Sequence, residues 1–286
     1  MSDAIISLHN LCYTYHAQQD AALRRPALSD VTLEIARGSC AALIGVTGSG
    51  KSTLVQHLNG LLRPTRGSVL VDGIEVVGVD ASDLQRLRQR VGLLFQFPEV
   101  QLFERTVFAD VAFGPRRLHL ERREVRTRVI QALEMVGLSH KEYAQRSPFE
   151  LSGGQRRRVA LAGVLAMQPT ILVLDEPGVG LDAAGKAEFY AQIQRLTSQG
   201  LTVVLVSHDM TEVMTLADTL FVLHQGCLVM QGTPREIFAQ PEALHGYGLA
   251  APPLSSLLMH MRRRGLEIPE EVATVDEVYH FLTRKR

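Results

Sequence analysis

Hydrophobic and polar residues alternate in the first third of the chain. Residues 31–35 change from apolar to polar at every step, which is the two-residue period of a strand with one buried face. Residues 68–77 read as two short strands joined at Asp72-Gly73, a dipeptide that favours a tight hairpin turn. The pattern therefore predicts antiparallel sheet in the N-terminal part.

Further along the chain the strands change character. Short, wholly apolar runs at 40–44, 171–174 and 202–206 alternate with segments of helical periodicity. Strands that are apolar on both faces are typical of a parallel sheet covered by helices on both sides. The sequence thus predicts an α/β nucleotide-binding architecture.

The predicted organisation has three parts. Helical periodicity without a convincing strand runs through the middle of the chain and predicts an inserted helical subdomain, whereas the looser composition after Gly232 predicts a small C-terminal extension. The ranges are 1–96 and 168–232 for the nucleotide-binding core with its antiparallel subdomain, 97–167 for the helical subdomain and 233–286 for the extension.

Composition narrows the class of protein. The 286 residues are 46% hydrophobic and 21% charged, enough apolar residues for a full core. Lys plus Arg and Asp plus Glu are 30 each, so no global charge favours nucleic acid or anionic lipid as a partner. Three scattered cysteines indicate a reducing compartment. No apolar run reaches the roughly 20 residues of a membrane span, and Met1 to Asn10 does not read as a secretory signal.

A phosphate-binding motif follows the first buried strand. Residues 45–52 read Gly-Val-Thr-Gly-Ser-Gly-Lys-Ser, which matches the P-loop pattern between a strand and a helix. Its glycines let backbone N–H groups face a phosphate, and the helix N-terminus adds positive potential. Lys51 then reaches the β and γ phosphates, and the Ser52 hydroxyl suits Mg²⁺. ATP and Mg²⁺ are therefore the expected ligands.

Two carboxylates and a second anion site complete the candidate chemistry. Asp175 and Glu176 end an apolar strand, at the sheet edge where ligands bind, with Asp175 suited to Mg²⁺ through water and Glu176 to a general base. Residues 151–155, Leu-Ser-Gly-Gly-Gln, precede another helix and form a second helix start that can hold an anion. One ATP does not need two such sites.

These motifs resemble those of ATP-binding-cassette ATPases from Ile5 to about Gly232. In that family the second anion site contacts the γ phosphate of ATP held by the opposite subunit, which implies a dimer. The resemblance also implies that Tyr15 stacks on adenine, with Tyr13 as a competing candidate, that Gln96 senses Mg²⁺ and couples to a membrane subunit, that His208 contacts the γ phosphate, and that Asp182 belongs to the loop linking the two sites.

The candidate site can be stated in full. The expected catalytic residues are Glu176 and His208, and the expected Mg²⁺ ligands are Ser52, Gln96 and Asp175. The residues expected to contact ATP are Tyr15, Gly45, Val46, Thr47, Gly48, Ser49, Gly50, Lys51, Ser52, Thr53, Gln96, Ser152, Gly153, Gly154, Gln155 and Asp182.

The stretch 96–103, Gln-Phe-Pro-Glu-Val-Gln-Leu-Phe, resembles the ATPase components of energy-coupling factor importers, especially the second of their two paired types. That likeness implies a second cassette ATPase, as hetero- or homodimer, an integral membrane coupling subunit and a substrate-binding membrane subunit. It implies uptake of vitamins or transition metal ions, a place at the cytoplasmic side of the cell membrane, and a C-terminal extension used in pairing.

Two other systems stay open at this stage. One is a dedicated cobalt or nickel importer, and the other is a soluble cassette protein acting on DNA or ribosomes, which the single compact cassette disfavours. Two local features depart from the usual pattern: Gly178-Val179 precedes the Gly-Leu-Asp loop, and Arg156, Arg157 and Arg158 follow the signature. We expect the first to affect packing, and the second to be a solvated helix face.

Overall fold

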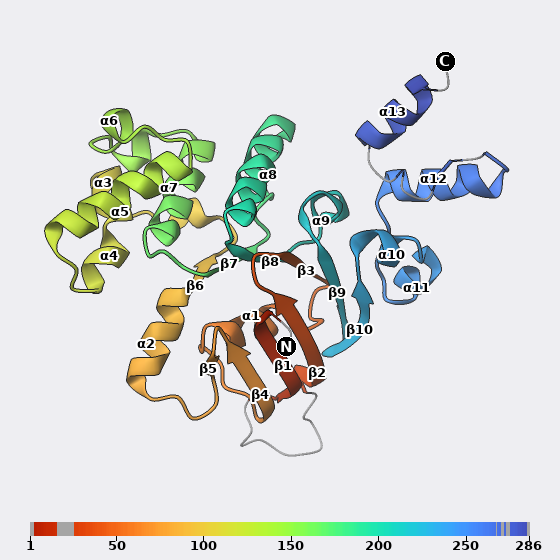
Figure 1. Cartoon of the computed structure of the whole chain (residues 1–286), viewed down its shortest axis with the longest axis horizontal. Helices are drawn as coiled ribbons and strands as arrows, with labels where there is room; N and C mark the ends of the chain where they lie inside the picture. The colour runs from red at the N-terminus through yellow and green to blue at the C-terminus, as the bar shows by residue number, and fades with distance from the viewer. Residues whose placement is uncertain (1–2, 16–25, 267, 270–271, 273–274, 285–286) are drawn as a thin grey trace.

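We describe a computed structural model of the chain over residues 3–15, 26–266, 268–269, 272 and 275–284. Two sheets form its centre, with helices gathered at one end and the C-terminal helices at the other (Figure 1). The predicted ranges 1–96 and 233–286 each include residues outside this described part, and the domain boundaries themselves stay a prediction. No helix in the described ranges has the length and apolar character needed to cross a membrane.

The smaller sheet is antiparallel, as the alternating pattern predicted. Its strand order is β2-β1-β4-β5, and β4 and β5 form the predicted hairpin at Asp72-Gly73, where both residues have positive φ. The strands are β1 (Ala4–Tyr13), β2 (Leu28–Ala36), β4 (Arg66–Val71) and β5 (Ile74–Glu75).

The larger sheet has the order β10-β9-β3-β8-β7-β6. Neighbouring strands from β9 to β6 are parallel, and β10 pairs antiparallel with β9. Three of its strands were predicted from apolar runs, whereas β6, β9 and β10 were not identified individually. The bounds are β3 (Cys40–Ile44), β6 (Val91–Leu94), β7 (Ile171–Asp175), β8 (Thr202–Val206), β9 (Thr219–His224) and β10 (Cys227–Gly232).

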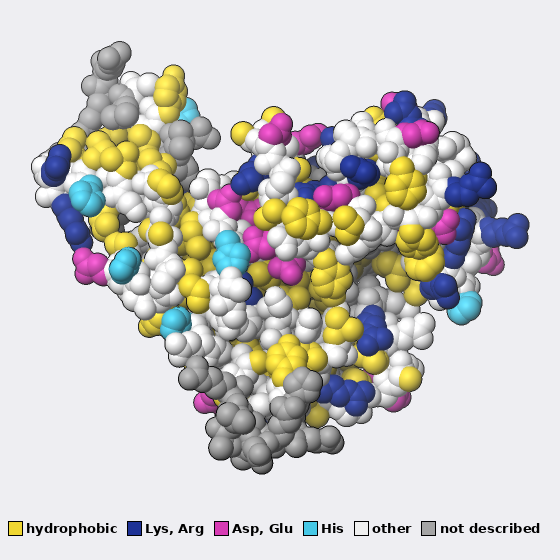
Figure 2. All heavy atoms as spheres, turned by 180° about the vertical axis from the view of Figure 1, so that it is seen from behind, with side chains coloured by type: hydrophobic (Ala, Val, Ile, Leu, Met, Phe, Trp, Pro, Cys, Tyr) yellow, Lys and Arg dark blue, Asp and Glu magenta, His cyan; other side chains and the backbone are white. Residues whose placement is uncertain are grey.

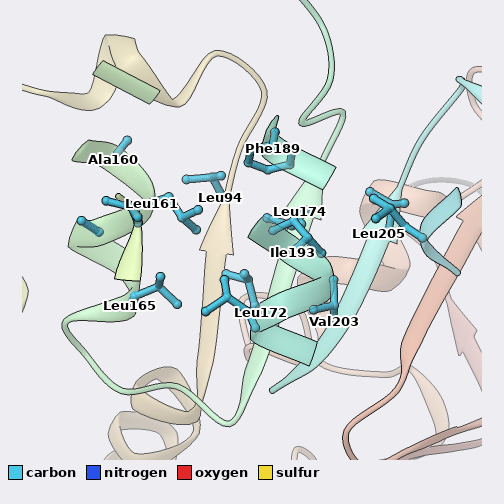
Figure 3. Packing of buried hydrophobic residues seen from close by; sticks show 14 of the residues in the cluster. Leu94, Ala160, Leu161, Leu165, Leu172, Leu174, Phe189, Ile193, Val203 and Leu205 are labelled. Carbon is cyan, nitrogen blue, oxygen red and sulfur yellow. The ribbon is translucent and has the colours of Figure 1, made fainter. Parts of the chain in front are cut away.

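The parallel strands are apolar throughout because each face packs into a different core. In β7, Leu172 and Leu174 face a core shared with helices (Figure 3), whereas Ile171 and Val173 face the core beneath the antiparallel sheet. β8 divides its residues between the two cores in the same way. Burial on both faces holds the carboxyl ends of these strands at a fixed edge.

Helices surround the larger sheet. α1 (Lys51–Leu58) packs against the core beneath the antiparallel sheet, and α2 (Ala81–Arg90) leads into β6. The middle of the chain is helical and has no strand over 97–167, all of which is described. Its elements are η2 (Pro98–Gln101), α3 (Val107–Val111), α4 (Phe113–Arg117), α5 (Arg122–Met135), α6 (His140–Tyr143), η3 (Pro148–Glu150) and α7 (Gly153–Leu165).

Two helices follow strands β7 and β8, and four further helices are described in the C-terminal part. α8 (Ala183–Ser198) and α9 (Met210–Leu216) follow β7 and β8, and α10 (Pro234–Phe238) and α11 (Pro241–Gly246) pack on the main core. α12 (Pro253–Arg263) and α13 (Val275–Arg284) share a small cluster around Leu258. Hydrophobic side chains also lie on the surface at this end (Figure 2, left), including Leu257, which is 56% exposed.

Candidate functional site

One cleft gathers most of the predicted site. A cavity of about 640 Å³ opens between the P-loop and the carboxyl ends of β6, β7 and β8. The cavity is lined by twelve of the predicted residues, namely Tyr15, Thr47, Gly48, Ser49, Gly50, Lys51, Ser52, Thr53, Gln96, Asp175, Glu176 and His208. Sequence reasoning did not anticipate three further lining residues, Ala27, Val179 and Val206.

The P-loop conformation explains its glycines. Gly50 has φ +107°, and a Cβ there would lie 2.7 Å from the carbonyl oxygen of Ala27, so a larger residue would collide with the backbone. Gly50 is also the N-cap of α1 and offers no side-chain acceptor, so no side chain caps the start of this helix. The backbone N–H groups at the start of α1, together with the helix dipole, face the cleft and suit a phosphate.

Lys51 is buried beside this loop and is 6% exposed. Its Nζ donates to the carbonyl oxygens of Gly45 at 2.6 Å and Val46 at 3.2 Å. Burial lowers the pKa of Lys51, and the carboxylates of Glu176 and Asp175 act in the opposite direction. The ammonium is therefore held within the loop, between its carbonyls and the acidic strand end.

Two carboxylates lie at the end of β7, Asp175 as its last residue and Glu176 directly after it. Burial raises the pKa of Asp175, and the electrostatic influence of Lys51 and His208 opposes this. Burial also raises the pKa of Glu176, opposed mainly by His208, whose Nε2 lies 3.3 Å from Oε1 of Glu176. Glu176 adopts φ +51°, a left-handed conformation that is uncommon for residues other than glycine. This turn directs the chain away at the point where the carboxylate enters the cleft.

The two competing tyrosines pack edge-on, with ring centroids 4.9 Å apart, but have different surroundings. Tyr15 lines the cleft, is 45% exposed, and its hydroxyl lies 3.1 Å from the Thr53 hydroxyl. Tyr13 instead packs edge-on against the buried His57, with ring centroids 4.9 Å apart, and against the core beneath the antiparallel sheet. Tyr15 therefore offers an accessible ring beside the P-loop, and Tyr13 contributes to packing.

The remaining predicted residues lie outside this cleft. Val46 lines an adjoining hollow, whereas Gly45, Ser152 to Gln155 and Asp182 line neither. Ser152 caps α7 through a hydrogen bond from the Gln155 backbone N–H at 3.3 Å, and Gln155 Oε1 accepts from Ser152 N–H at 3.0 Å. Asp182 caps α8 by accepting from Gly185 N–H at 2.7 Å.

The prediction for the arginine run was wrong at one position. Arg157 is 4% exposed and donates to the backbone carbonyls of Pro177 and Val179, so it does not belong to a solvated face. A signal was present in the sequence: Arg157, Leu161 and Leu165 are four residues apart, the spacing of one helix face, and both leucines are buried.

A buried carboxyl behind the cleft was also missed. Glu212 is 1% exposed and accepts a hydrogen bond from the Ser207 hydroxyl at 2.5 Å. Burial raises its pKa to about 7. A Cβ on Gly178 would lie 3.0 Å from Glu212 Oε1, so the glycine at this unusual position leaves room for the carboxyl. The expectation that Gly178 affects packing fits this contact.

Comparison with known proteins assigns the family. The sequence model of the ABC transporter family matches residues 28–179. The energy-coupling factor transporter ATP-binding protein EcfA2 of Symbiobacterium thermophilum is 53% identical over 251 residues, covering 88% of this chain and 86% of that protein. EcfA2 of Clostridium tetani is 43% identical, covering 95% of this chain and 94% of the relative.

Solved structures agree with this assignment. The cbiO1 protein of Clostridium perfringens, part of the ABC transporter complex cbiONQ, matches with TM-score 0.76 and 35% identity over 90% of this chain and all of that one. The ATP-binding cassette MJ0796, solved as a post-hydrolysis dimer with ADP and Pi, matches with TM-score 0.68 and 29% identity over 80% of this chain and 98% of that one. The chain belongs to the ABC transporter family of ATPases, and within it to the ATP-binding proteins of energy-coupling factor transporters.

Proposed function

We propose that this chain hydrolyses ATP to power an energy-coupling factor importer for vitamins or transition metal ions, at the cytoplasmic side of the cell membrane. The observation that carries the proposal is the single cleft that joins the P-loop to Gln96, Asp175, Glu176 and His208. The likeness to energy-coupling factor ATPases supports the transport system.

The cleft also suits Mg²⁺. Ser52, Gln96 and Asp175 line it together and offer a hydroxyl, an amide and a carboxylate, and oxygen atoms are the ligands that Mg²⁺ prefers. We therefore assign the ion to these three side chains. When bound, Mg²⁺ neutralises charge on the β and γ phosphates.

The protein groups divide the chemistry between them. The P-loop N–H groups and the Lys51 ammonium hold the phosphates, and the Tyr15 ring stacks on the base. Glu176 orients the attacking water and takes its proton, because it lines the cleft with the P-loop and lies beside His208, whereas Asp175 is assigned to Mg²⁺. His208 adjoins Glu176 and stabilises the developing charge on the γ phosphate.

A second ATPase subunit completes the site. The helix start at Ser152, Gly153 and Gly154 lies outside this chain's own cleft, which supports its use by the opposite subunit. In the same arrangement Asp182 lies in the loop between the two sites, and ATP binding closes the dimer while hydrolysis reopens it. Exposed apolar residues of the C-terminal part, Leu257, Leu266 and Tyr279, suit a role in pairing.

The membrane subunits meet the helical part. Exposed aromatic side chains lie next to Gln96 in the sequence and on the helices that follow. Among them are Phe97, Phe103 and Phe149, at 44%, 58% and 62% exposure. On the right of Figure 2, hydrophobic and basic side chains are interleaved on the surface. Exposed apolar patches mark protein–protein contacts, so we assign this face to an integral membrane coupling subunit, which in turn serves a substrate-binding membrane subunit. We propose no nucleic-acid partner.

Replacement of the proposed general base tests the assignment. Glu176→Gln keeps the shape of the side chain and removes its basicity, so ATP turnover should fall about 10²- to 10⁴-fold while ATP binding persists. Glu188→Gln on the surface of α8 is the matched control, because this carboxyl is 63% exposed and lies outside the cleft. Wild-type turnover in Glu176→Gln would contradict the proposal.

The likeness to cbiO1 supports a second system, a dedicated cobalt or nickel importer. Affinity purification of the tagged chain from native membranes in mild detergent separates the two. Recovery of a different cassette ATPase with a multi-spanning protein supports the energy-coupling factor system. Recovery of a homodimer with one metal-importer membrane set supports the dedicated importer, and recovery without any membrane protein argues for a soluble cassette.

A further inference from the structure

A buried cation lies where three segments of the nucleotide-binding machinery meet. Arg157 begins the buried face of α7, and its side chain is 5% exposed. A guanidinium removed from water to this degree is costly unless its charge and its N–H groups are satisfied by the protein. The identity of its partners therefore says what the residue holds in place.

Two of the partners are backbone carbonyls next to the proposed general base. Arg157 Nη1 donates to the Pro177 oxygen at 2.6 Å, and Nη2 donates to the Val179 oxygen at 2.8 Å. Pro177 follows Glu176 directly, and Val179 precedes the loop that ends at Asp182. The planar fork of an arginine fixes both carbonyls in one geometry, which a lysine cannot do.

The third partner comes from the segment after Gln96. Arg157 Nε lies 3.6 Å from Oε2 of Glu99, which belongs to η2 and is 21% exposed. Within the described residues this Oε2 is buried and accepts no hydrogen bond, so the guanidinium is the charge that compensates it. A buried ion pair thus joins η2 to α7.

The segment after Gln96 also touches the loop after Glu176 directly. A Cβ on Gly180 would lie 3.9 Å from Cε1 of Phe97, so the ring adjacent to Gln96 lies against the loop after Glu176. Both Phe97 and Glu176 have left-handed φ, +53° and +51°, where the chain leaves the adjacent strands β6 and β7. A displacement of η2 therefore also displaces the chain that follows β7.

We infer that Arg157 is a positioning residue that transmits the position of η2 to the backbone around Glu176, so that the membrane-facing turn controls the rate of hydrolysis. The inference rests on the proposed function, in which Gln96 couples to the membrane subunit and Glu176 activates water. If η2 moves away, either the Glu99 ion pair breaks in a buried site or Arg157 moves and draws the carbonyls of Pro177 and Val179 with it.

The neighbour Arg158 provides a matched control. It has the same charge on the same helix, but its side chain is 27% exposed and pairs with Glu188 of α8 at 3.0 Å. Its side-chain hydrogen bond goes to Glu188, and not to η2 or to the carbonyl oxygens of Pro177 and Val179. Arg158→Gln thus removes one positive charge from α7 without touching the three-way junction.

The test measures kcat and KM for Mg-ATP in the tagged complex purified from membranes, for Arg157→Gln, Glu99→Gln and the double variant. Each single variant should lower kcat by about 2- to 30-fold, with KM for ATP changed less than about twofold. Since both act through one pair, the double variant should be no slower than the slower single variant. Arg158→Gln should keep the kcat of the wild type.

Glu99→Gln keeps both carbonyl hydrogen bonds of Arg157, so it provides a result even if Arg157→Gln fails to fold. Losses that multiply in the double variant, an unchanged kcat in Glu99→Gln, or an equal loss in Arg158→Gln would each overturn the inference. Glu176→Gln is measured in parallel: if it retains activity, the proposed function fails, whereas an inactive Glu176→Gln with normal Glu99→Gln refutes only the role of Arg157.

Discussion

His208 contacts both oxygens of the Glu176 carboxylate. Its Nε2 lies 3.3 Å from Oε1, and its backbone N–H donates to Oε2 at 3.4 Å. The two residues follow the neighbouring parallel strands β8 and β7, so the sheet fixes their separation. The pair joins the proposed base to the proposed γ-phosphate contact.

This relationship predicts a large effect of His208→Ala. The backbone N–H contact persists, but the ring beside Glu176 is lost, so kcat should fall about 10²- to 10³-fold with little change in ATP affinity. Steady-state ATPase assays and ATP titration by calorimetry measure the two quantities. His260→Ala, an exposed histidine of α12, should retain wild-type turnover. An equal loss in both variants would indicate a general effect of the substitution.

Two identical capping arrangements allow stability and function to be separated. Ser152 caps α7 and Thr233 caps α10, each through a reciprocal capping box. Alanine at either position should lower the free energy of unfolding by about 0.5–2 kcal/mol, measured by urea denaturation. Only Ser152→Ala should also lower ATP turnover, because Thr233 is not among the residues proposed to contact ATP. Equal turnover in the two variants would show that Ser152 does not contact ATP.

Tyr15 and Tyr13 should respond differently to substitution. Tyr15→Ala removes an accessible ring from the cleft and should weaken ATP binding about fivefold or more, because stacking of a base on an aromatic ring contributes about 1–3 kcal/mol. Tyr15→Phe should bind ATP as the wild type does. Tyr13→Ala should lower Tm and weaken ATP binding less than Tyr15→Ala does, since Tyr13 packs on His57 and only supports the Tyr15 ring edge-on. Calorimetric titration and thermal unfolding test this contrast.

Glu212 predicts a pH dependence of stability. Burial raises its pKa from 4.5 to about 7, so the folded protein keeps a proton that the unfolded chain releases in this range. The contribution of protonated Glu212 to the free energy of unfolding is fully present below a pH of about 4.5 and is lost as the pH rises to about 7. Besides burial, the groups that surround Glu212 and act on its pKa are Ser207, Asp209, Glu176, Lys186 and Tyr190.

Glu212→Gln removes this titration. Unfolding in urea at a series of pH values should show that stability falls between about pH 4.5 and 7 in the wild type by on the order of 1–3 kcal/mol more than in the variant. Glu75→Gln, an exposed carboxyl of β5, is the control and should follow the wild-type curve. Parallel curves for wild type and Glu212→Gln would show that the pKa of Glu212 is the same in the folded and unfolded states.

Local patterns were enough for much of the fold and for the P-loop. Strands β3 and β8 were predicted at their observed bounds, because a buried strand between helices is apolar at every position. β6 was missed because it has only four residues with Gly92 among them. A Cβ at Gly92 would collide with Val164 of α7, so this glycine reflects close packing, which its sequence neighbours do not reveal.

The sequence by itself determined the chemistry: the spacing of P-loop, acidic strand end, signature and histidine is written in short motifs, since phosphate binding needs particular residues in consecutive positions. Only the tertiary structure decided which side chains share an environment. The Tyr15 hydroxyl meets Thr53, 38 positions away, and Arg157 reaches Pro177, 20 positions away. Burial and charge pairing depend on such distant contacts, so the accessibility of Tyr15 and the partners of Arg157 became identifiable only once the chain was folded.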